Sequence, residues 1–361
     1  MERVLMSGNE AIARGSFEAG CRFTTGYPGT PSTEILESIA GYEGIFANWA
    51  VNEKVALETA SGACLAGARS IVTMKHVGLN VASDPLMTLA YTGVGAGLVV
   101  VSADDHGIHS SQNEQDNRWY TLIAKIPILE PSDSEEARLF TVRTFEISER
   151  FDLPVLLRMT TRVSHSTSII FPQGPVRSGQ PTAPGKDPGR KVMVPSNARR
   201  ARRTLEGKLQ ELGWFSEQLP LNRTERGTAD YGIITAGISY QYVKEVAPHA
   251  NVLKIALTNP LPAGRIQGFA RDFRKVLVVE ELDPFLEMQI KHLSPGIRGK
   301  EFVPSVSELT PDVMRDSVRR FTAGPHASEG PVAGQATGMP DVLQHSLVLC
   351  PGVPTGVSFT S

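Results

Sequence analysis

The chain has 361 residues, more than one hydrophobic core usually holds, so two or three domains are expected. Its 36 basic and 38 acidic side chains leave a formal charge of −2, which gives no reason to expect nucleic acid or a membrane surface as a partner. No apolar run has membrane-spanning length, and the N-terminus does not read as a signal peptide. The three scattered cysteines form neither a disulfide framework nor a cluster-binding run, so we expect a cytoplasmic protein.

The first 165 residues alternate short apolar runs with helical periodicity. Strands are expected at 22–27, 45–51, 70–75, 97–104, 126–130 and 154–160, and helices at 8–19, 32–39, 52–66, 80–91 and 134–149. Nearly continuous apolar strands are typical of a sheet that is buried on both faces. The pattern therefore predicts an α/β domain with a mostly parallel sheet and helices on both faces. Ligands bind such sheets at the carboxyl ends of the strands, so the loops there are the candidate sites.

The rest of the chain divides into a linker, a smaller domain and a tail. Residues 166–229 are rich in Pro and Gly at first and then contain a basic helix at about 197–212. This helix carries four arginines: Arg199, Arg200, Arg202 and Arg203. They could bind phosphate or a partner chain, but a solvated helix face is the favoured interpretation. Residues 230–325 predict a smaller α/β domain with strands at 231–235, 252–256 and 276–280. Residues 326–361 are expected to be a flexible tail.

The segment GYPGTPS directly follows the first strand and precedes a helix. Pro28 and Pro31 stiffen this turn, while Gly29 lets the backbone approach a ligand closely. Thr30 and Ser32 offer hydroxyls at a helix start, where free N–H groups favour an anion or a carbonyl. A rigid turn with Ser32 as the helix cap explains the same residues without a ligand.

The segment after the second strand places a carboxylate at the start of a helix. Asn52 is expected to cap this helix, and Glu53 in its first turn is favoured by the helix dipole, so Glu53 has a structural explanation as well as a catalytic one. Small residues along one face of the helix allow another backbone to pack very close: Ala56, Ala60, Ala63 and Gly67. That face suits a buried interface.

After the third strand, the segment MKHVGLN places two cationic residue types at the sheet edge. Lys75 and His76 end the strand, Gly78 is expected to open a turn, and Asn80 is expected to cap the next helix. A single histidine here is as compatible with hydrogen-bonded scaffolding as with proton transfer.

A long polar run, residues 104–118, follows the fourth strand. Asp104, His106 and His109 could be imagined as metal ligands, but their spacing is not that of a zinc site, and substrate binding is the favoured interpretation. Arg118 ends the run and is a candidate for holding a substrate carboxylate, since a guanidinium pairs with a carboxylate through two hydrogen bonds.

Several of these segments, in this order, resemble the alpha subunits of indolepyruvate ferredoxin oxidoreductases, which are thiamine-diphosphate-dependent 2-oxoacid:ferredoxin oxidoreductases. The resemblance covers roughly residues 5–320 and is carried by these segments: TGYPGTPSTEI, WAVNEKVALETASGACLAGARS, TMKHVGLNVASDPLMTLAYTGV, SADDHGIHSSQNEQDNRWY, PSNARRARRTLEGKL and VLVVEELDPFLEMQIK. It implies a pyrimidine-binding domain at 1–165 and a transketolase C-terminal-like domain at 230–325.

The resemblance also implies a reaction and its participants. An arylpyruvate such as indolepyruvate, coenzyme A and oxidised ferredoxin would become the aryl-acetyl-CoA, carbon dioxide and reduced ferredoxin, with thiamine diphosphate carrying the chemistry. In thiamine enzymes a Glu hydrogen-bonds N1′ of the aminopyrimidine and favours the tautomer that removes the C2 proton, and Glu53 aligns with that catalytic residue. Substrate contacts are implied for Thr30, Arg118 and His109. Cofactor contacts are implied for Glu53 and the surrounding loops: Tyr27, Pro28, Gly29, Lys75, His76 and Gly78.

The chain departs from the family pattern after the smaller domain, where the family continues into a diphosphate-binding domain. Thiamine enzymes grip the diphosphate through Mg²⁺ on a second domain, usually with a GDG motif, and no GDG occurs here. The ending LCPGVPTGVSF resembles the start of that domain but lacks the second Cys and the His. We therefore expect Mg²⁺ and iron–sulfur clusters on other parts, no metal on this chain, and as partners a diphosphate-binding domain or subunit, the beta subunit and ferredoxin.

Two alternatives remain open from the sequence. One is a truncated or non-catalytic chain that keeps the fold for assembly or regulation. The other is a self-contained metal or phosphate enzyme that uses the loop around His106 and His109.

Overall fold

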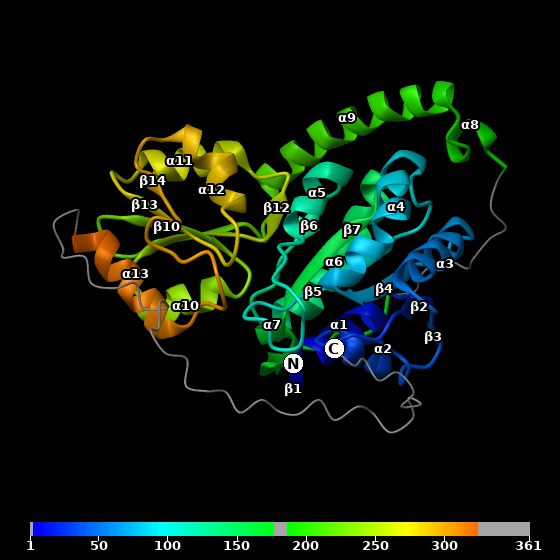
Figure 1. The fold of residues 1–361 in the computed structure, drawn as a ribbon, viewed down its shortest axis with the longest axis horizontal. Coiled ribbons are helices and arrows are strands. Elements are labelled where there is room, and N and C mark those ends of the chain that lie inside the picture. The colour runs from blue at the N-terminus through cyan, green and yellow to red at the C-terminus, as the bar shows by residue number, and fades with distance from the viewer. Residues whose placement is uncertain (1–2, 177–185, 324–361) are drawn as a thin grey trace, which may run out of the picture.

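The structure, a computed structural model, describes residues 3–176 and 186–323, which form two α/β lobes flanked by one long helix (Figure 1). The larger lobe is built on a seven-stranded sheet in the order β12-β6-β7-β5-β4-β2-β3. The strands are β2 (Phe23–Gly26), β3 (Phe46–Trp49), β4 (Ser70–Lys75), β5 (Leu98–Asp104), β6 (Ile128–Leu129), β7 (Val155–Thr160) and β12 (Leu257–Asn259). All neighbouring pairs are parallel except β12 with β6. The predicted α/β class with a parallel sheet is confirmed.

The helices of the larger lobe cover both faces of this sheet. They are α1 (Gly8–Glu18), α2 (Thr33–Ile39), α3 (Glu53–Leu65), α4 (His76–Thr92), α5 (Arg118–Ala124), α6 (Ser134–Phe151) and α7 (Thr161–His165). Asn52 caps α3 as expected, because its side chain accepts a hydrogen bond from the Val55 N–H at 2.9 Å. The side chain of Ser32 makes no cap hydrogen bond and donates instead to the Gly29 carbonyl oxygen.

The start of α4 differs from the sequence expectation. The helix begins at His76 rather than Asn80, and Lys75 occupies the N-cap position in an extended backbone conformation. The prediction that Asn80 caps this helix is wrong, since its side chain is one turn inside the helix and exchanges hydrogen bonds with Gln115. The loop after β4 is thus shorter than expected, and Gly78 lies in the first turn of a helix.

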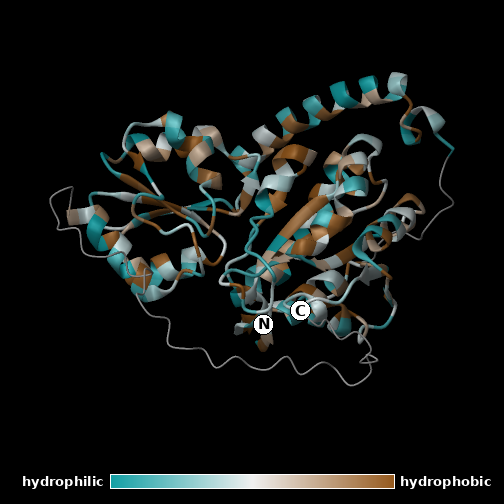
Figure 2. Cartoon of the chain, viewed as in Figure 1, coloured by the Kyte–Doolittle hydropathy of each residue, from teal (hydrophilic) through white to brown (hydrophobic). Residues whose placement is uncertain are grey.

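The smaller lobe contains a five-stranded sheet in the order β14-β13-β10-β11-β9. Its strands are β9 (Arg223–Glu225), β10 (Gly232–Ala236), β11 (Asn251–Ile255), β13 (Val276–Val279) and β14 (Ile297–Arg298). Its helices are α10 (Ser239–Val246), α11 (Ala263–Arg271), α12 (Phe285–Ile290), the 3₁₀ turn Lys291–Leu293 and α13 (Pro311–Ala323). The three strands expected in this part of the sequence are β10, β11 and β13. Figure 2 shows that the apolar residues are concentrated on the strands of both sheets.

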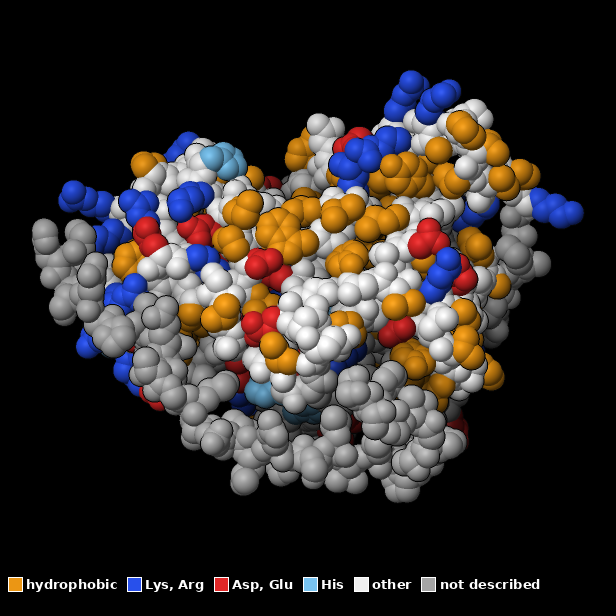
Figure 3. All heavy atoms as spheres, in the orientation of Figure 1, with side chains coloured by type: hydrophobic (Ala, Val, Ile, Leu, Met, Phe, Trp, Pro, Cys, Tyr) orange, Lys and Arg blue, Asp and Glu red, His pale blue; other side chains and the backbone are white. Residues whose placement is uncertain are grey.

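The segment between the lobes contains more structure than a linker. A two-stranded antiparallel sheet joins β1 (Val4–Ser7) to β8 (Thr167–Ile170), and α8 (Pro188–Lys191) precedes the 24-residue helix α9 (Pro195–Gln218). In α9 only Leu205, Leu212 and Ser216 are buried. Its four arginines are exposed, as a solvated helix face requires, and basic side chains gather along this edge in Figure 3.

The two lobes are joined by an exchanged strand. Strand β12 follows β11 in the chain but pairs with β6, with Leu257 opposite Leu129. Beside it, Asn259 Nδ2 donates to the carbonyl oxygens of Thr121 and Ile126 at 3.2 and 2.8 Å. Because these contacts are buried, the smaller lobe is fixed against the larger one. Within the described ranges, no helix is long and apolar enough to cross a bilayer.

Candidate functional site

The carboxyl ends of β2, β4 and β5 bring together the loops that the sequence singled out. Lys75 Nζ donates to the carbonyl oxygen of Ser110 at 2.6 Å, and Ser110 Oγ lies 3.4 Å from the carbonyl oxygen of Thr30. The backbone of Gly29 lies against the same lysine, because a Cβ added at Gly29 would stand 3.2 Å from the Lys75 Cβ. The turn at 26–32, the start of α4 and the polar run therefore form one edge.

Helix α1 holds the turn at 26–32 in place. Asn9, which is buried, donates from Nδ2 to the Pro31 carbonyl oxygen at 2.8 Å and to Glu34 at 3.2 Å. The Gly29 N–H donates to the Thr33 hydroxyl at 2.9 Å. Thr30 remains exposed on the turn, so its hydroxyl is available to a bound molecule.

Glu53 is the first residue of α3 and is only 9% exposed. Its carboxylate packs on the backbone of Gly78, where an added Cβ would come within 2.5 Å of Glu53 Oε1. It forms no hydrogen bond or ion pair with any residue in the ranges 3–176 and 186–323. Neither carboxylate oxygen is among the fully buried side-chain atoms that lack a partner, so the group keeps some contact with solvent, through which a ligand, a water or a second chain could reach it. The geometry favours a donor supplied from outside the described chain.

The start of α4, on which Glu53 packs, is fixed by the polar run. Asn117 Nδ2 donates to the His76 carbonyl oxygen at 2.9 Å and to Ser102 Oγ at 2.6 Å. Gln115 donates to the same carbonyl oxygen at 3.3 Å. His76 itself is fully buried, with Nε2 3.2 Å from the Asn113 carbonyl oxygen and Nδ1 without a hydrogen-bond partner in the described structure. His76 is therefore turned toward the polar run and away from solvent.

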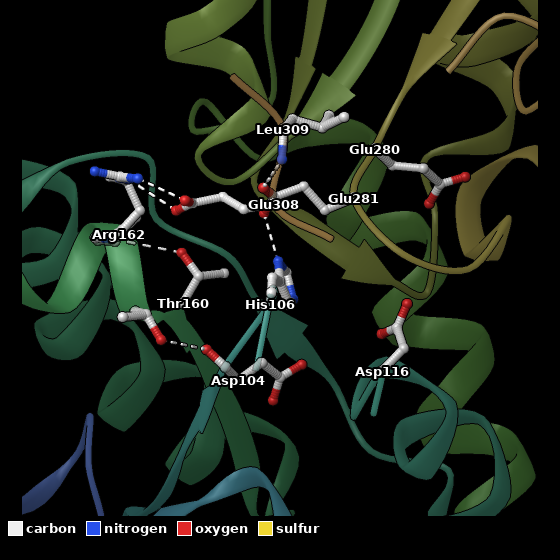
Figure 4. A network of polar contacts seen from close by, with 12 residues as sticks. Asp104, His106, Asp116, Thr160, Arg162, Glu280, Glu281, Glu308 and Leu309 are labelled. Atoms are coloured by element: carbon white, nitrogen blue, oxygen red, sulfur yellow. Dashed lines mark hydrogen bonds and ion pairs between the residues drawn. The ribbon is translucent and has the colours of Figure 1, made fainter. Parts of the chain in front are cut away.

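The other end of the polar run is bound to the smaller lobe (Figure 4). His106 Nδ1 lies 2.7 Å from Glu281 Oε2, and both side chains are buried. The exposed His109 lies 3.7 Å from Glu308, which also pairs with Arg162. The two histidines thus face different carboxylates, and the part of the chain that the structure describes contains no group of three or more potential metal ligands.

Arg118 is the most heavily bonded residue of the run, and it is 1% exposed. It pairs with Asp116 at 2.5 Å and Glu280 at 2.8 Å, and it donates to the carbonyl oxygens of Glu281 and Asp283 at 2.9 and 3.2 Å. Although burial alone would lower the pKa of Arg118, the charges of Asp116 and Glu280 raise it well above its usual value. Binding of a substrate carboxylate by Arg118 would require it to release one of these partners.

The residues that sequence reasoning missed are those that hold the loops. Asn9, Gln115 and Asn117 are buried or half-buried amides whose hydrogen bonds fix the turn and the start of α4. Glu280 and Glu281 from the smaller lobe bind the polar run. Adjacent acids directly after an apolar strand, as in VLVVEE, are the one signal that could have pointed to the last two residues.

A family model matches the part of the chain that contains this edge of the sheet. Residues 14–194 match the model described as pyruvate flavodoxin/ferredoxin oxidoreductase, thiamine diphosphate-binding. The match covers half of the chain and includes both Glu53 and the polar run. The chain belongs to this family of thiamine-diphosphate-binding oxidoreductase domains.

Curated relatives narrow the resemblance further. The chain is 40% identical over 370 residues to indolepyruvate oxidoreductase subunit IorA of Methanothermobacter thermautotrophicus, covering 98% of this chain and 59% of that one. It is 39% identical over 381 residues to subunit IorA of Archaeoglobus fulgidus, covering 99% of this chain and 60% of that one. The chain therefore spans about three-fifths of the length of these relatives.

Solved structures support the fold. The 2-oxoglutarate:ferredoxin oxidoreductase from Magnetococcus marinus superimposes with a TM-score of 0.72 at 20% identity, covering 88% of this chain and 65% of that chain. A split-gene transketolase superimposes with a TM-score of 0.57 at 14% identity, covering 88% of this chain and 98% of that chain. The predicted combination of a pyrimidine-binding lobe with a transketolase C-terminal-like lobe is confirmed as a fold.

The residues at the site fit an aminopyrimidine. The unpartnered Glu53 carboxylate can accept a hydrogen bond from a ring nitrogen, and the bare backbone at Gly78 leaves room for the carboxylate beneath a ring. Within the described ranges, no three His, Cys, Asp or Glu side chains lie close enough together to hold a metal ion.

Proposed function

We propose that this chain supplies the pyrimidine-binding half of a thiamine diphosphate site in a ferredoxin-dependent oxidoreductase that converts arylpyruvates such as indolepyruvate to aryl-acetyl-CoA. The observation that carries this proposal is the largely buried Glu53 side chain at the carboxyl edge of a parallel sheet, whose carboxylate has no partner among the described residues. Thiamine diphosphate, when bound, would supply the carbanion-stabilising chemistry of the decarboxylation. Glu53 would hold a proton at N1′ of the pyrimidine ring.

The surrounding loops would position the ring and the substrate. Tyr27, Pro28 and Gly29 form the turn beside the site, and Gly78 forms its base. His76 would support that base from below rather than touch the reacting atoms. Thr30 would offer its exposed hydroxyl to the substrate, and the exposed ring of His109 would also contact the substrate.

A second polypeptide or domain would complete the site. Large apolar side chains are exposed just after β2, at both ends of β3, between β3 and α3, and in the first turn of α3: Tyr27, Phe46, Trp49, Val51 and Val55. Phe46 is 63% exposed and Val51 79% exposed. Exposed apolar groups on the strand and helix that flank Glu53 are typical of a surface that another chain covers. That partner would bind the diphosphate and Mg²⁺, and the beta subunit, iron–sulfur clusters, coenzyme A and ferredoxin would belong to the same assembly.

The test is Glu53→Gln in an assembly reconstituted with the polypeptide that carries the diphosphate-binding domain. The variant should slow exchange of the cofactor C2 proton and 2-oxoacid oxidation by about 10²- to 10⁴-fold, the usual contribution of a positioned acid–base group. Glu58→Gln is the matched control, because Glu58 is exposed on the same helix. Equal activity of the Glu53→Gln and wild-type assemblies would instead indicate a chain that keeps the fold for assembly alone.

A further inference from the structure

A 2-oxoacid substrate brings a carboxylate to the site, and few described cations there are free to meet it. Five Lys or Arg side chains lie at or just beyond the carboxyl ends of the strands: Lys54, Lys75, Arg118, Arg158 and Arg162. All except Lys75 have a carboxylate oxygen within 2.8 Å. Lys75 has no ion pair within 4.0 Å among the residues that the structure describes. The charge of each of the other four is already balanced by a neighbouring carboxylate.

The surroundings of Lys75 place its ammonium between the turn at 26–32 and the polar run. Its stem lies along Gly29, and its Nζ is held by the Ser110 carbonyl oxygen at 2.6 Å. An ammonium has three donors, so two remain after this bond. Ser110 also touches the carbonyl oxygen of Thr30, so the ammonium lies close to the turn that carries the Thr30 hydroxyl. Lys75 also precedes by three residues the Gly78 backbone on which Glu53 packs.

The nearby carboxylate of Asp105 forms no ion pair with Lys75 within 4.0 Å, although its charge still acts on the lysine. Asp105 accepts hydrogen bonds from the Ser110 N–H at 2.8 Å, from Thr161 at 2.8 Å and from the Ser111 hydroxyl. Partial burial lowers the pKa of Lys75, and the charge of Asp105 only opposes this effect. A half-buried cation without a paired anion is stabilised when a negative ligand arrives.

We propose that Lys75, rather than Arg118, binds the carboxylate of the 2-oxoacid substrate. This inference rests on the proposed function, because it assumes that the crevice beside Glu53 takes such a substrate. Arg118 becomes a positioning residue, which fixes the polar run to the smaller lobe and so keeps Ser110 beneath the ammonium.

The experiment uses the reconstituted assembly with phenylpyruvate as the substrate and five chains: wild type, Lys75→Met, Lys75→Arg, Lys54→Met and Glu53→Gln. Lys75→Met should raise KM by about 10- to 100-fold with a smaller change in kcat, since a charge-assisted hydrogen bond contributes that much to binding. Lys75→Arg should recover part of the loss because it keeps the charge. Lys54→Met is the control, since Lys54 is an exposed lysine already paired with Asp84.

A second measurement does not depend on turnover. Phenylpyruvate should protect Lys75 of the wild-type assembly from acetylation by acetic anhydride, read by mass spectrometry, whereas phenylacetone, which lacks the carboxylate, should not. Suppose that Glu53→Gln lowers activity as proposed. An unchanged KM in Lys75→Met, together with equal acetylation of Lys75 with and without phenylpyruvate, would then overturn the inference and leave the proposed function intact. If Glu53→Gln kept full activity, the proposed function would fail, and the inference would fail with it.

Discussion

The contact between Glu53 and Gly78 gives the sharpest prediction, for Gly78→Ala. The added methyl group would lie 2.5 Å from Oε1, 2.7 Å from Cγ and 2.8 Å from Cδ of Glu53, which are distances that real contacts do not show. The backbone of α4 is held by the hydrogen bonds of Asn117 and Gln115 to the His76 carbonyl oxygen. The Glu53 side chain has no such bonds, so it is the group that should move.

The expected result separates function from stability. Ala is favoured over Gly inside a helix by about 0.5–1 kcal/mol, which offsets much of the cost of moving one side chain. We therefore expect a free energy of unfolding within about 1 kcal/mol of wild type. A displacement of the carboxylate by about 1 Å is expected to slow catalysis by on the order of 10²-fold.

The assays are urea denaturation of the chain and C2-proton exchange of thiamine diphosphate in the reconstituted assembly. Gly62→Ala is the matched control, because Gly62 lies in α3 and an added Cβ there meets no atom within 4 Å. The free energy of unfolding of this control should rise, and its assembly should exchange the C2 proton at the wild-type rate. A Gly78→Ala assembly that exchanges the proton at the wild-type rate would refute the assignment of Glu53 to the ring nitrogen.

Three further outcomes follow from buried charges and thiols. Arg118→Met should lower the free energy of unfolding by about 3–5 kcal/mol in urea denaturation, because it leaves two buried carboxylates without their cation. Burial lowers the pKa of Lys300 from 10.5 to about 8, so between these pH values the unfolded chain binds a proton that the folded chain does not. The free energy of unfolding of the wild type, relative to that of Lys300→Met, should therefore rise with pH in this window by at most about 1.4 kcal/mol per pH unit. A difference between the two chains that does not change with pH would contradict this prediction. Cys21 and Cys64 are buried, and burial raises the pKa of both thiols to about 12, so iodoacetamide at pH 8 should modify them only after denaturation, as mass spectrometry can check.

The local sequence was sufficient to predict the parallel strands of the sheet in the larger lobe. Strand β5, like β13 of the smaller lobe, contains a continuous apolar run, and a strand buried on both faces carries that signal along its own length. Asn52 could be recognised as the cap of α3 for the same reason, since its bond to the Val55 N–H spans three residues. Glu53 could be placed at the carboxyl edge of the sheet because it directly follows that cap.

Tertiary structure alone decided the other half of the site. Strand β12 pairs with β6 across more than a hundred residues, and its three residues carry too little pattern to reveal that partner. The ion pair between Arg118 and Glu280 could not be predicted either, because 162 residues separate the two partners in the sequence. From the sequence, both Arg118 and Lys75 looked like free cations at a sheet edge. Which of them is neutralised depends on carboxylates that the smaller lobe brings into contact, because ion pairing acts over a few ångströms in space and leaves no periodic trace along the chain.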